Sequence, residues 1–337
     1  MTPLLEVRGL RTHFKTDDGA FPAVDGVSFS VAAGRTLAIV GESGCGKSVT
    51  ALSIMGLVQS PPGRIDAGSI RFEGKELVGA PNRELQDLRG NGMAMIFQEP
   101  MSSLNPAFTI GDQIIEGLMR HRPIGRAEAT RRALAMLEKV RLAAPEQRFH
   151  DHPHKLSGGM RQRAMIAMAV ACDPRLLIAD EPTTALDVTI QAQILDLMRT
   201  LQREAGTAIV LITHDLGVVA EVADEVVVMY AGRIVEQAPV RTLFEAPQHP
   251  YTIGLLGSIP RLDADRVRLA SIDGQVPSPL RRATGCSFAE RCPFADAHCR
   301  SAAPELREVG SQHLSACWKA PLDAETLMAN RPEPALA

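Results

Sequence analysis

The stretch Gly41-Glu42-Ser43-Gly44-Cys45-Gly46-Lys47-Ser48 decides how the rest of this 337-residue chain is interpreted. It has the G-x-x-x-x-G-K-S spacing of a phosphate-binding loop, in which backbone N–H groups curl around anionic oxygens and glycines leave room for them. Lys47 can supply a point charge to the β- and γ-phosphates, and the Ser48 hydroxyl suits Mg²⁺. The stretch therefore predicts a nucleoside triphosphate site.

The flanking residues fit this interpretation. Leu37–Val40 is a short apolar run typical of a buried strand, and residues 49–57 continue as a helix. A helix that begins directly after the loop adds the positive end of its dipole to the bound anion. The predicted nucleotide-binding residues of this segment are Gly41, Ser43, Gly44, Cys45, Gly46, Lys47, Ser48 and Val49.

Two adjacent carboxylates follow a second apolar strand. Asp180 and Glu181 come at the end of Leu176–Ala179, so both should emerge at the carboxyl edge of an open α/β sheet, where ligands collect. We expect Asp180 to hold Mg²⁺, directly or through water. We expect Glu181 to orient or deprotonate the water that attacks the γ-phosphate.

The pattern of apolar runs predicts an α/β fold with a mainly parallel sheet. Residues 208–212 and 226–229 are further buried strands, and residues 4–35 form short strands of a small antiparallel layer. Residues 109–172 change character, because apolar side chains recur there at helical spacing within an Arg- and Glu-rich segment. We interpret that segment as an inserted helical lobe.

A third motif, Leu156-Ser157-Gly158-Gly159-Met160, precedes a helix. By itself it predicts only a helix N-cap. The order of the motifs along the chain, however, resembles the ATPase domain of ABC transporters, and this segment is similar to their signature. In that family Ser157, Gly158 and Gly159 would contact the ATP held by the opposite subunit. The resemblance therefore implies that two such domains complete each ATP site.

The resemblance implies roles for four more residues. Gln98 matches the loop glutamine that senses nucleotide and Mg²⁺ and contacts the membrane subunits, and Asp187 matches the loop that joins the two sites. His214 matches the switch histidine, which contacts the γ-phosphate and the Glu181 side. Phe14 falls where the family stacks an aromatic ring on adenine, with Phe21 as a rival in the same region.

Composition limits the partners. The net charge of −3 provides no basic field to collect nucleic acid. The start of the chain lacks the basic and apolar pattern of a signal peptide, and no run approaches the roughly 18 uncharged apolar residues of a membrane helix. We therefore expect a soluble, cytoplasmic protein whose membrane role comes through its partners.

Beyond residue 245 the pattern breaks into short pieces that contain four cysteines. Cys286, Cys292, Cys299 and Cys317 are separated by 5, 6 and 17 residues. Cysteines gathered in a cytoplasmic protein favour a metal or a cluster over disulfides. Without paired C-x-x-C knuckles, both Zn²⁺ and a [4Fe–4S] cluster stay open.

Several short segments narrow the family. His249-Pro250-Tyr251-Thr252, Gly285-Cys286-Ser287-Phe288 and Arg291-Cys292-Pro293 resemble the C-terminal extension of oligopeptide/dipeptide importer ATPases, and Glu42-Ser43-Gly44 fits the same subfamily. Several such subunits carry a [4Fe–4S] cluster there, so the resemblance ranks iron–sulfur above zinc. The expected organisation is an ATPase domain over residues 1–245, the extension over 246–320 and a tail over 321–337.

The resemblance implies an ATP-hydrolysing, energy-coupling subunit on the cytoplasmic face of the inner membrane. Its partners would be a homologous ATPase in a heterodimer, two transmembrane permease subunits and an extracytoplasmic solute-binding protein. The solute would be a short peptide, with nickel or another small solute as alternatives. A soluble ABC-type ATPase acting on the ribosome or nucleic acid is the rival from another class. Such proteins usually carry two ATPase halves or long coiled-coil insertions, and this chain has neither.

Overall fold

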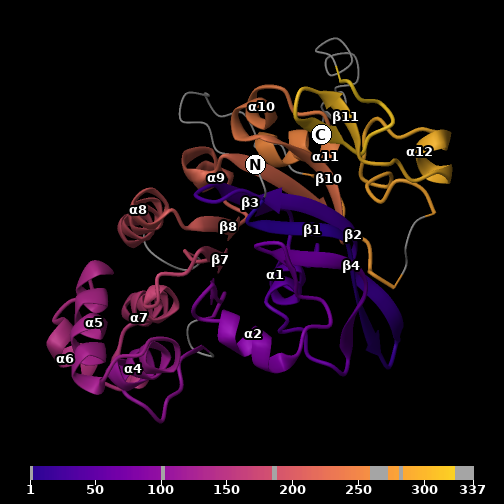
Figure 1. Cartoon of the computed structure of the whole chain (residues 1–337). Helices are drawn as coiled ribbons and strands as arrows, with labels where there is room; N and C mark the ends of the chain where they lie inside the picture. The colour runs from indigo at the N-terminus through magenta and orange to yellow at the C-terminus, as the bar shows by residue number, and fades with distance from the viewer. Residues whose placement is uncertain (1–2, 100–102, 184–187, 259–271, 281–283, 323–337) are drawn as a thin grey trace.

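Two β-sheets and a group of helices organise the chain in this computed structural model (Figure 1). The structure describes residues 3–99, 103–183, 188–258, 272–280 and 284–322. In the described strands, the larger sheet has the order β11-β12-β10-β9-β3-β8-β7-β6 and the smaller sheet the order β2-β1-β4-β5.

Strand β3 (Thr36–Val40) lies inside the larger sheet between β9 (Glu225–Tyr230) and β8 (Ala208–Ile212), parallel to both. Every residue of β3 and β8 is buried, as expected of parallel strands covered on both faces. β7 (Leu176–Asp180) and β6 (Met93–Ile96) continue the parallel set beyond β8. Parallel strands end at one edge, so the residues that follow β3, β6, β7 and β8 are brought together.

The opposite side of the larger sheet is antiparallel. β10 (Arg233–Pro239) pairs with β9, and β12 (His313–Ser315) and β11 (Arg307–Gly310) extend the sheet further. The C-terminal region is thus joined by main-chain pairing to the sheet that carries the phosphate loop. The domain boundary at residue 245 stays a prediction.

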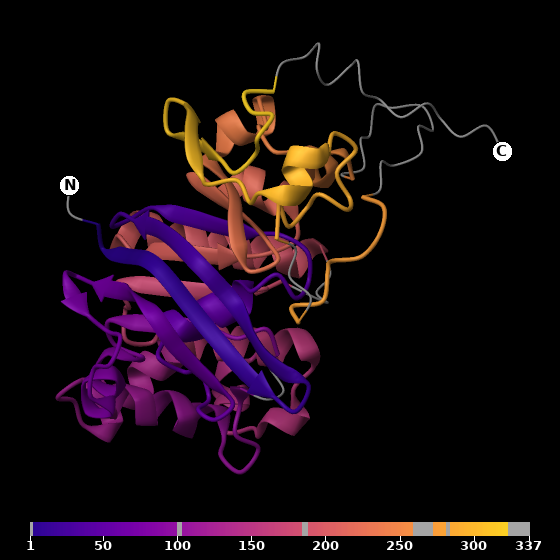
Figure 2. The same cartoon turned by 90° about the vertical axis from the view of Figure 1, so that its right-hand side faces the viewer.

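The smaller sheet is antiparallel throughout its described strands, which are β1 (Leu5–Thr16), β2 (Gly19–Val31), β4 (Gly63–Phe72) and β5 (Lys75–Glu76). Its apolar residues share one buried cluster with residues of β3, β7 and β8. This packing holds the antiparallel layer against the parallel sheet, and Figure 2 shows the indigo strands of the layer face on.

Helices α4 (Ile110–His121), α5 (Arg126–Lys139), α6 (Pro145–Phe149) and α7 (Gly158–Val170) form the helical lobe. They gather at one side of the molecule, away from α12 (Ala297–Ser301) in the C-terminal region (Figure 1). Their inward-facing apolar residues make a single cluster with β6 and β7. The lobe therefore agrees with the helical segment expected from residues 109–172.

The remaining helices flank the sheets. No described helix combines the length and the apolar character that crossing a bilayer requires. The parallel core, the antiparallel layer and the helical lobe all match the predicted fold class. The other described helices are α1 (Lys47–Ile54), α2 (Asn82–Leu88), the 3-10 turn Pro153–Lys155, α8 (Val188–Ala205), α9 (Leu216–Val222), α10 (Val240–Glu245) and α11 (Pro250–Gly257).

Candidate nucleotide site

The phosphate loop connects β3 to α1 and depends on two glycines. Gly41 and Gly46 have φ angles of 148° and 99°, in the region that favours glycine. A Cβ at Gly41 would lie 2.2 Å from the carbonyl oxygen of Met229, and one at Gly46 would lie 2.4 Å from that of Ala23. Larger residues would therefore push the loop off the neighbouring backbone.

The phosphate loop encloses a buried lysine, and two of its other residues are exposed to solvent. Lys47 is buried, and its Nζ donates to the carbonyl oxygens of Gly41 at 2.7 Å and Glu42 at 2.9 Å. Gly46 caps α1 without a side-chain acceptor among the described residues, so the first N–H groups of the helix can serve an anion. Ser43 and Gly44 are exposed, whereas the buried Cys45 packs beneath the loop. Burial raises the pKa of the Cys45 thiol, as expected for a packing residue.

Asp180 has the environment of a cation ligand. It ends β7, is buried, and its Oδ1 has no hydrogen-bond partner within the described part of the chain. Burial raises the pKa of Asp180 and the charge of Glu181 adds to the rise, while a hydrogen bond with Ser48 and the charge of Lys47 oppose it. Mg²⁺ would offset the cost of burying this carboxylate. The donor set of Ser48 and Asp180 therefore fits the metal expected from the sequence.

Glu181 lies where the ends of three parallel strands meet. Gln98, which follows β6, donates from Nε2 to Glu181 Oε2 at 3.3 Å. His214, which follows β8, places its Nδ1 3.4 Å from Glu181 Oε1. The φ of Glu181 is 47°, a strained value for a residue with a side chain, and its N–H donates to the Ile212 carbonyl at 2.8 Å. Strain of this kind is typical of functional positions.

The signature segment lies at the start of α7, in the helical lobe. Ser157 is the N-cap of α7 and accepts a hydrogen bond from the Met160 N–H at 3.4 Å. Ser157 and Gly158 are exposed, and a Cβ at Gly158 would meet no atom within 4 Å among the described residues. α7 belongs to the helical lobe (Figure 1), and the exposure of Ser157 and Gly158 leaves its N-terminus open to solvent. Asp187 lies outside the described residues.

The two aromatic candidates for adenine stacking are neighbours with different surroundings. Phe14 and Phe21 are opposite each other on β1 and β2, and their ring centroids are 6.2 Å apart. Phe21 lines a cavity of about 90 Å³ together with Gly44 of the phosphate loop, whereas Phe14 lines a separate hollow with Pro61 and Gly63. Phe21 is thus the aromatic ring next to the loop, and the stacking of Phe14 on adenine stays a prediction.

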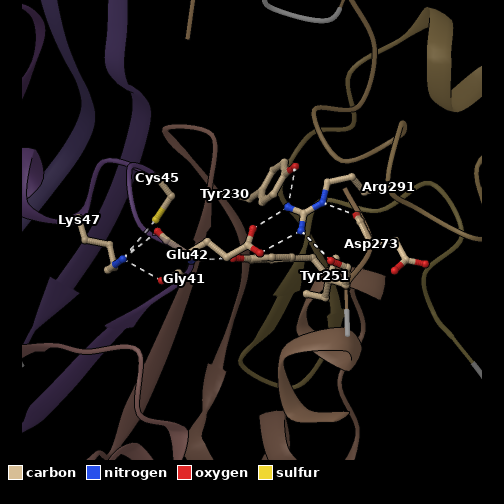
Figure 3. A network of polar contacts seen from close by, with 9 residues as sticks. Gly41, Glu42, Cys45, Lys47, Tyr230, Tyr251, Asp273 and Arg291 are labelled. Atoms are coloured by element: carbon tan, nitrogen blue, oxygen red, sulfur yellow. Dashed lines mark hydrogen bonds and ion pairs between the residues drawn. The ribbon is translucent and has the colours of Figure 1, made fainter. Parts of the chain in front are cut away.

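Sequence reasoning assigned no role to two residues that contact the loop, Tyr251 and Arg291 (Figure 3). The Glu42 N–H donates to Tyr251 Oη at 2.8 Å. Arg291 forms an ion pair with the Glu42 carboxylate and also contacts Tyr230. The sequence signal was present, because Glu42, Tyr251 and Arg291 all stand in segments that carry the resemblance to one subfamily. Their proximity comes only from the fold.

The four C-terminal cysteines are free thiols, and three of them lie near enough to Cys292 for their charges to affect it. Burial, with smaller contributions from the neighbouring Cys317, Cys286 and Cys299, raises the pKa of Cys292 to about 12. The backbone links two of them, because the Cys286 N–H donates to the Cys299 carbonyl at 2.8 Å. Among the described residues, however, no three or more His, Cys, Asp or Glu side chains have the arrangement of a metal site. The geometry thus does not support the expected cluster, although the thiols are neighbours.

The fold and this site define an ABC-type ATPase. Residues 24–184 match the family model of the ABC transporter, and residues 235–299 match that of the oligopeptide/dipeptide transporter, C-terminal region. The chain therefore belongs to the ATP-binding subunits of the oligopeptide/dipeptide ABC transporter family.

Individual relatives are similar in sequence to almost the whole of this chain. The probable peptide ABC transporter ATP-binding protein y4tR of Sinorhizobium fredii is 55% identical over 94% of this chain and 95% of its own length. The oligopeptide transport ATP-binding protein AppD of Bacillus subtilis is 54% identical over 94% of this chain and 97% of its own. A solved structure, the dimeric post-hydrolysis state of the ATP-binding cassette MJ0796 bound to ADP and Pi, has a TM-score of 0.65 and 26% identity. The match covers 70% of this chain and 99% of the chain in that structure. The chain is thus similar to ATP-binding subunits of peptide transporters over 94% of its length and to an ATP-binding cassette over 70% of it.

Proposed function

We propose that this ABC ATPase hydrolyses MgATP at the edge formed by the phosphate loop, Asp180 and Glu181, and that the energy drives import of short peptides. The observation that carries the proposal is the position of Glu181, whose carboxylate is contacted by Gln98 and His214 next to the phosphate loop. A carboxylate held by residues from neighbouring strand ends is suited to orient an attacking water.

Each side chain then has a role in phosphoryl transfer. The loop and the start of α1 bind the phosphates, and Lys47 leaves its carbonyl partners to pair with the β- and γ-oxygens. Ser48 and Asp180 would hold Mg²⁺, which neutralises charge on the phosphates. Glu181 accepts a proton from the water or aligns it, while Gln98 and His214 keep its carboxylate in place. The chemistry therefore rests mainly on positioning and charge stabilisation.

The site needs a second ATPase. Ser157, Gly158 and Gly159 present an open helix N-terminus in the helical lobe, which is suited to the γ-phosphate bound by a facing subunit. We assign Asp187 to the loop that would join the two sites across the dimer, as its match to the family implies. We place a homologous but different chain opposite this one, as a heterodimer. Closure around two ATP molecules then moves the membrane subunits, and hydrolysis allows reopening.

The transported solute is a short peptide, supported by the relatives whose names describe peptide or oligopeptide transport. The partners are two permease subunits and an extracytoplasmic solute-binding protein, and the chain works at the cytoplasmic face of the inner membrane. Nickel or another small solute is the alternative cargo. The rival function on the ribosome or nucleic acid is opposed by the net charge of −3 and by the match to the transporter C-terminal region.

For the cysteines, the finer proposal is a [4Fe–4S] cluster held by Cys286, Cys292, Cys299 and Cys317, with Zn²⁺ as the alternative. Its support is the kind of side chain and not the described geometry. Four buried or half-buried thiols gather in one region of the chain, and a metal would favour their ionisation, which burial opposes. Anaerobic purification followed by iron, sulfide and zinc analysis distinguishes the two. A protein with neither iron nor zinc would contradict both.

The function is tested by isolating the chain from membranes and measuring uptake. Co-purification of two permeases and a second ATPase, with ATP-dependent uptake of radiolabelled peptides into vesicles, is the expected result. Recovery with ribosomes or DNA would contradict it. Transport of nickel with no peptide uptake would support an importer whose solute is nickel and not a peptide.

A further inference from the structure

An arginine from the C-terminal region forms a two-pronged ion pair with the phosphate loop (Figure 3). Arg291 Nη1 lies 2.6 Å from Glu42 Oε2, and Arg291 Nη2 lies 2.9 Å from Glu42 Oε1. The two residues are 249 positions apart in the chain. This bidentate geometry fixes the carboxylate in orientation as well as in distance.

The guanidinium is itself rigidly held. Arg291 Nε donates to the Asp273 carbonyl at 2.9 Å, Nη2 to the Ile272 carbonyl at 3.2 Å and Nη1 to Tyr230 Oη at 3.4 Å. Its side chain is only 5% exposed and lies over the ring of Tyr230, 5.8 Å from the centroid. Backbone carbonyls of the extension hold the Arg291 side chain. A shift of the extension would therefore also move the group that pairs with Glu42.

Glu42 connects this arginine to the lysine that serves the phosphates. The N–H of Glu42 donates to Tyr251 Oη at 2.8 Å, so α11 also holds the loop. The carbonyl of Glu42 accepts from Lys47 Nζ at 2.9 Å. Figure 3 shows Lys47 and Arg291 on opposite sides of Glu42. One residue of the loop thus contacts the extension through its side chain and N–H and the lysine through its carbonyl.

The ion pair with Arg291 also changes the charge that Glu42 presents beside the nucleotide. The Glu42 side chain is 30% exposed and belongs to the loop that receives a polyanion. An unpaired carboxylate there would repel the phosphates, and a paired one repels them less. Arg291 therefore both fixes the loop and neutralises an acid beside the nucleotide.

We propose that Arg291 is a positioning residue for ATP binding, through which the C-terminal extension shapes the phosphate loop of its own chain. The inference rests on the proposed nucleotide site and goes further, because it assigns part of the ATP affinity to a region outside the ATPase motifs. Arg291 does not touch the phosphates and acts through Glu42.

The test compares Arg291→Met with the double variant Arg291→Met/Glu42→Gln in the full-length chain. Arg291→Met should weaken MgATP binding by about tenfold, a usual size for coupling between sites. The double variant should recover to within about threefold of wild type, because removing both charges leaves no unpaired acid. Arg300→Met, at an exposed arginine of the same region, is the control and should bind as wild type.

A role in folding alone would give a different pattern. The double variant would then bind as weakly as Arg291→Met, and this outcome would overturn the proposal. The loss in Arg291→Met should also shrink as salt rises, since salt screens the partly exposed carboxylate of Glu42. In amide exchange without nucleotide, peptides covering residues 41–48 should exchange faster in Arg291→Met, and unchanged exchange would contradict the positioning role.

Two further results keep the test decisive. If Arg291→Met does not fold, Arg291→Lys keeps the charge without the two-pronged geometry and should bind MgATP about threefold more weakly. Wild-type affinity in Arg291→Lys would overturn the inference. If wild type itself binds no MgATP, the proposed nucleotide site is wrong. If wild type binds and Arg291→Met binds equally well, only the inference fails.

Discussion

Gln98 and Glu181 meet across the ends of two parallel strands, with the amide Nε2 of Gln98 3.3 Å from the Oε2 of Glu181. The contact exists because β6 and β7 are paired in parallel and end at the same edge. Glu181 has a φ of 47°, a backbone conformation that costs about 1–3 kcal/mol for a residue with a side chain. The fold thus holds this carboxylate in an unfavourable backbone geometry, which is reasonable where the carboxylate has to face a substrate.

Glu181→Gln should reduce phosphate release by at least about 10²-fold, because the amide can position water and cannot accept its proton. ATP binding should be retained, and the variant should accumulate in the ATP-bound dimer. Phosphate release and MgATP affinity are measured on the assembled transporter. The exposed Glu204 provides the matched control, since Glu204→Gln should hydrolyse at the wild-type rate. Normal turnover in Glu181→Gln would remove Glu181 as the base.

Ser157→Asp should separate the signature's structural role from its role toward the partner. Aspartate is as good an N-cap as serine, so the thermal stability of the chain should not change. The added negative charge would face the γ-phosphate of the opposite subunit, and hydrolysis should fall at least about tenfold. MgATP binding to the isolated chain should stay within about twofold of wild type, since its own phosphate loop is unchanged. Reduced affinity in the isolated chain would show that Ser157 acts in its own site.

His249 predicts a pH dependence of stability. It is buried at the N-cap of α11, where its Nδ1 accepts from the Tyr251 N–H, and burial lowers its pKa to about 3. The unfolded chain binds a proton near pH 6.5 and the folded chain does not, so stability falls as the pH drops from about 6.5 towards 3. His249→Asn keeps a capping acceptor that does not titrate in this range. Denaturant unfolding between pH 7 and 4.5 should show a smaller loss in this variant. An equal loss in both proteins would contradict the assignment.

Cys292→Ser tests the thiol group of the extension. If the thiols hold a cluster, the variant should lose iron and sulfide, or zinc under the alternative. The C-terminal region should become more sensitive to proteolysis, while ATP binding stays measurable. Cys172→Ser is the control, because Cys172 is a buried packing residue near α4 and should not alter metal content. Equal metal content in wild type and Cys292→Ser would exclude Cys292 as a ligand.

The local motifs were readable from the sequence because their chemistry depends on residues close together in the chain. The phosphate loop, the acids at the end of β7 and the cap of α7 each need only a strand or helix end and a few neighbouring residues. The helical lobe was recognisable for the same reason, since its buried residues Ala133, Leu137 and Val140 repeat at helical spacing.

Tertiary structure alone decided which distant segments meet. The addition of β11 and β12 to the main sheet and the ion pair of Arg291 with Glu42 both join segments whose spacing carries no common pattern. Local propensity and periodicity report on neighbours within a few residues, whereas these contacts depend on how whole layers pack. The sequence therefore determined that this chain has an ATP site, and the packing of its last third decided what holds that site in shape.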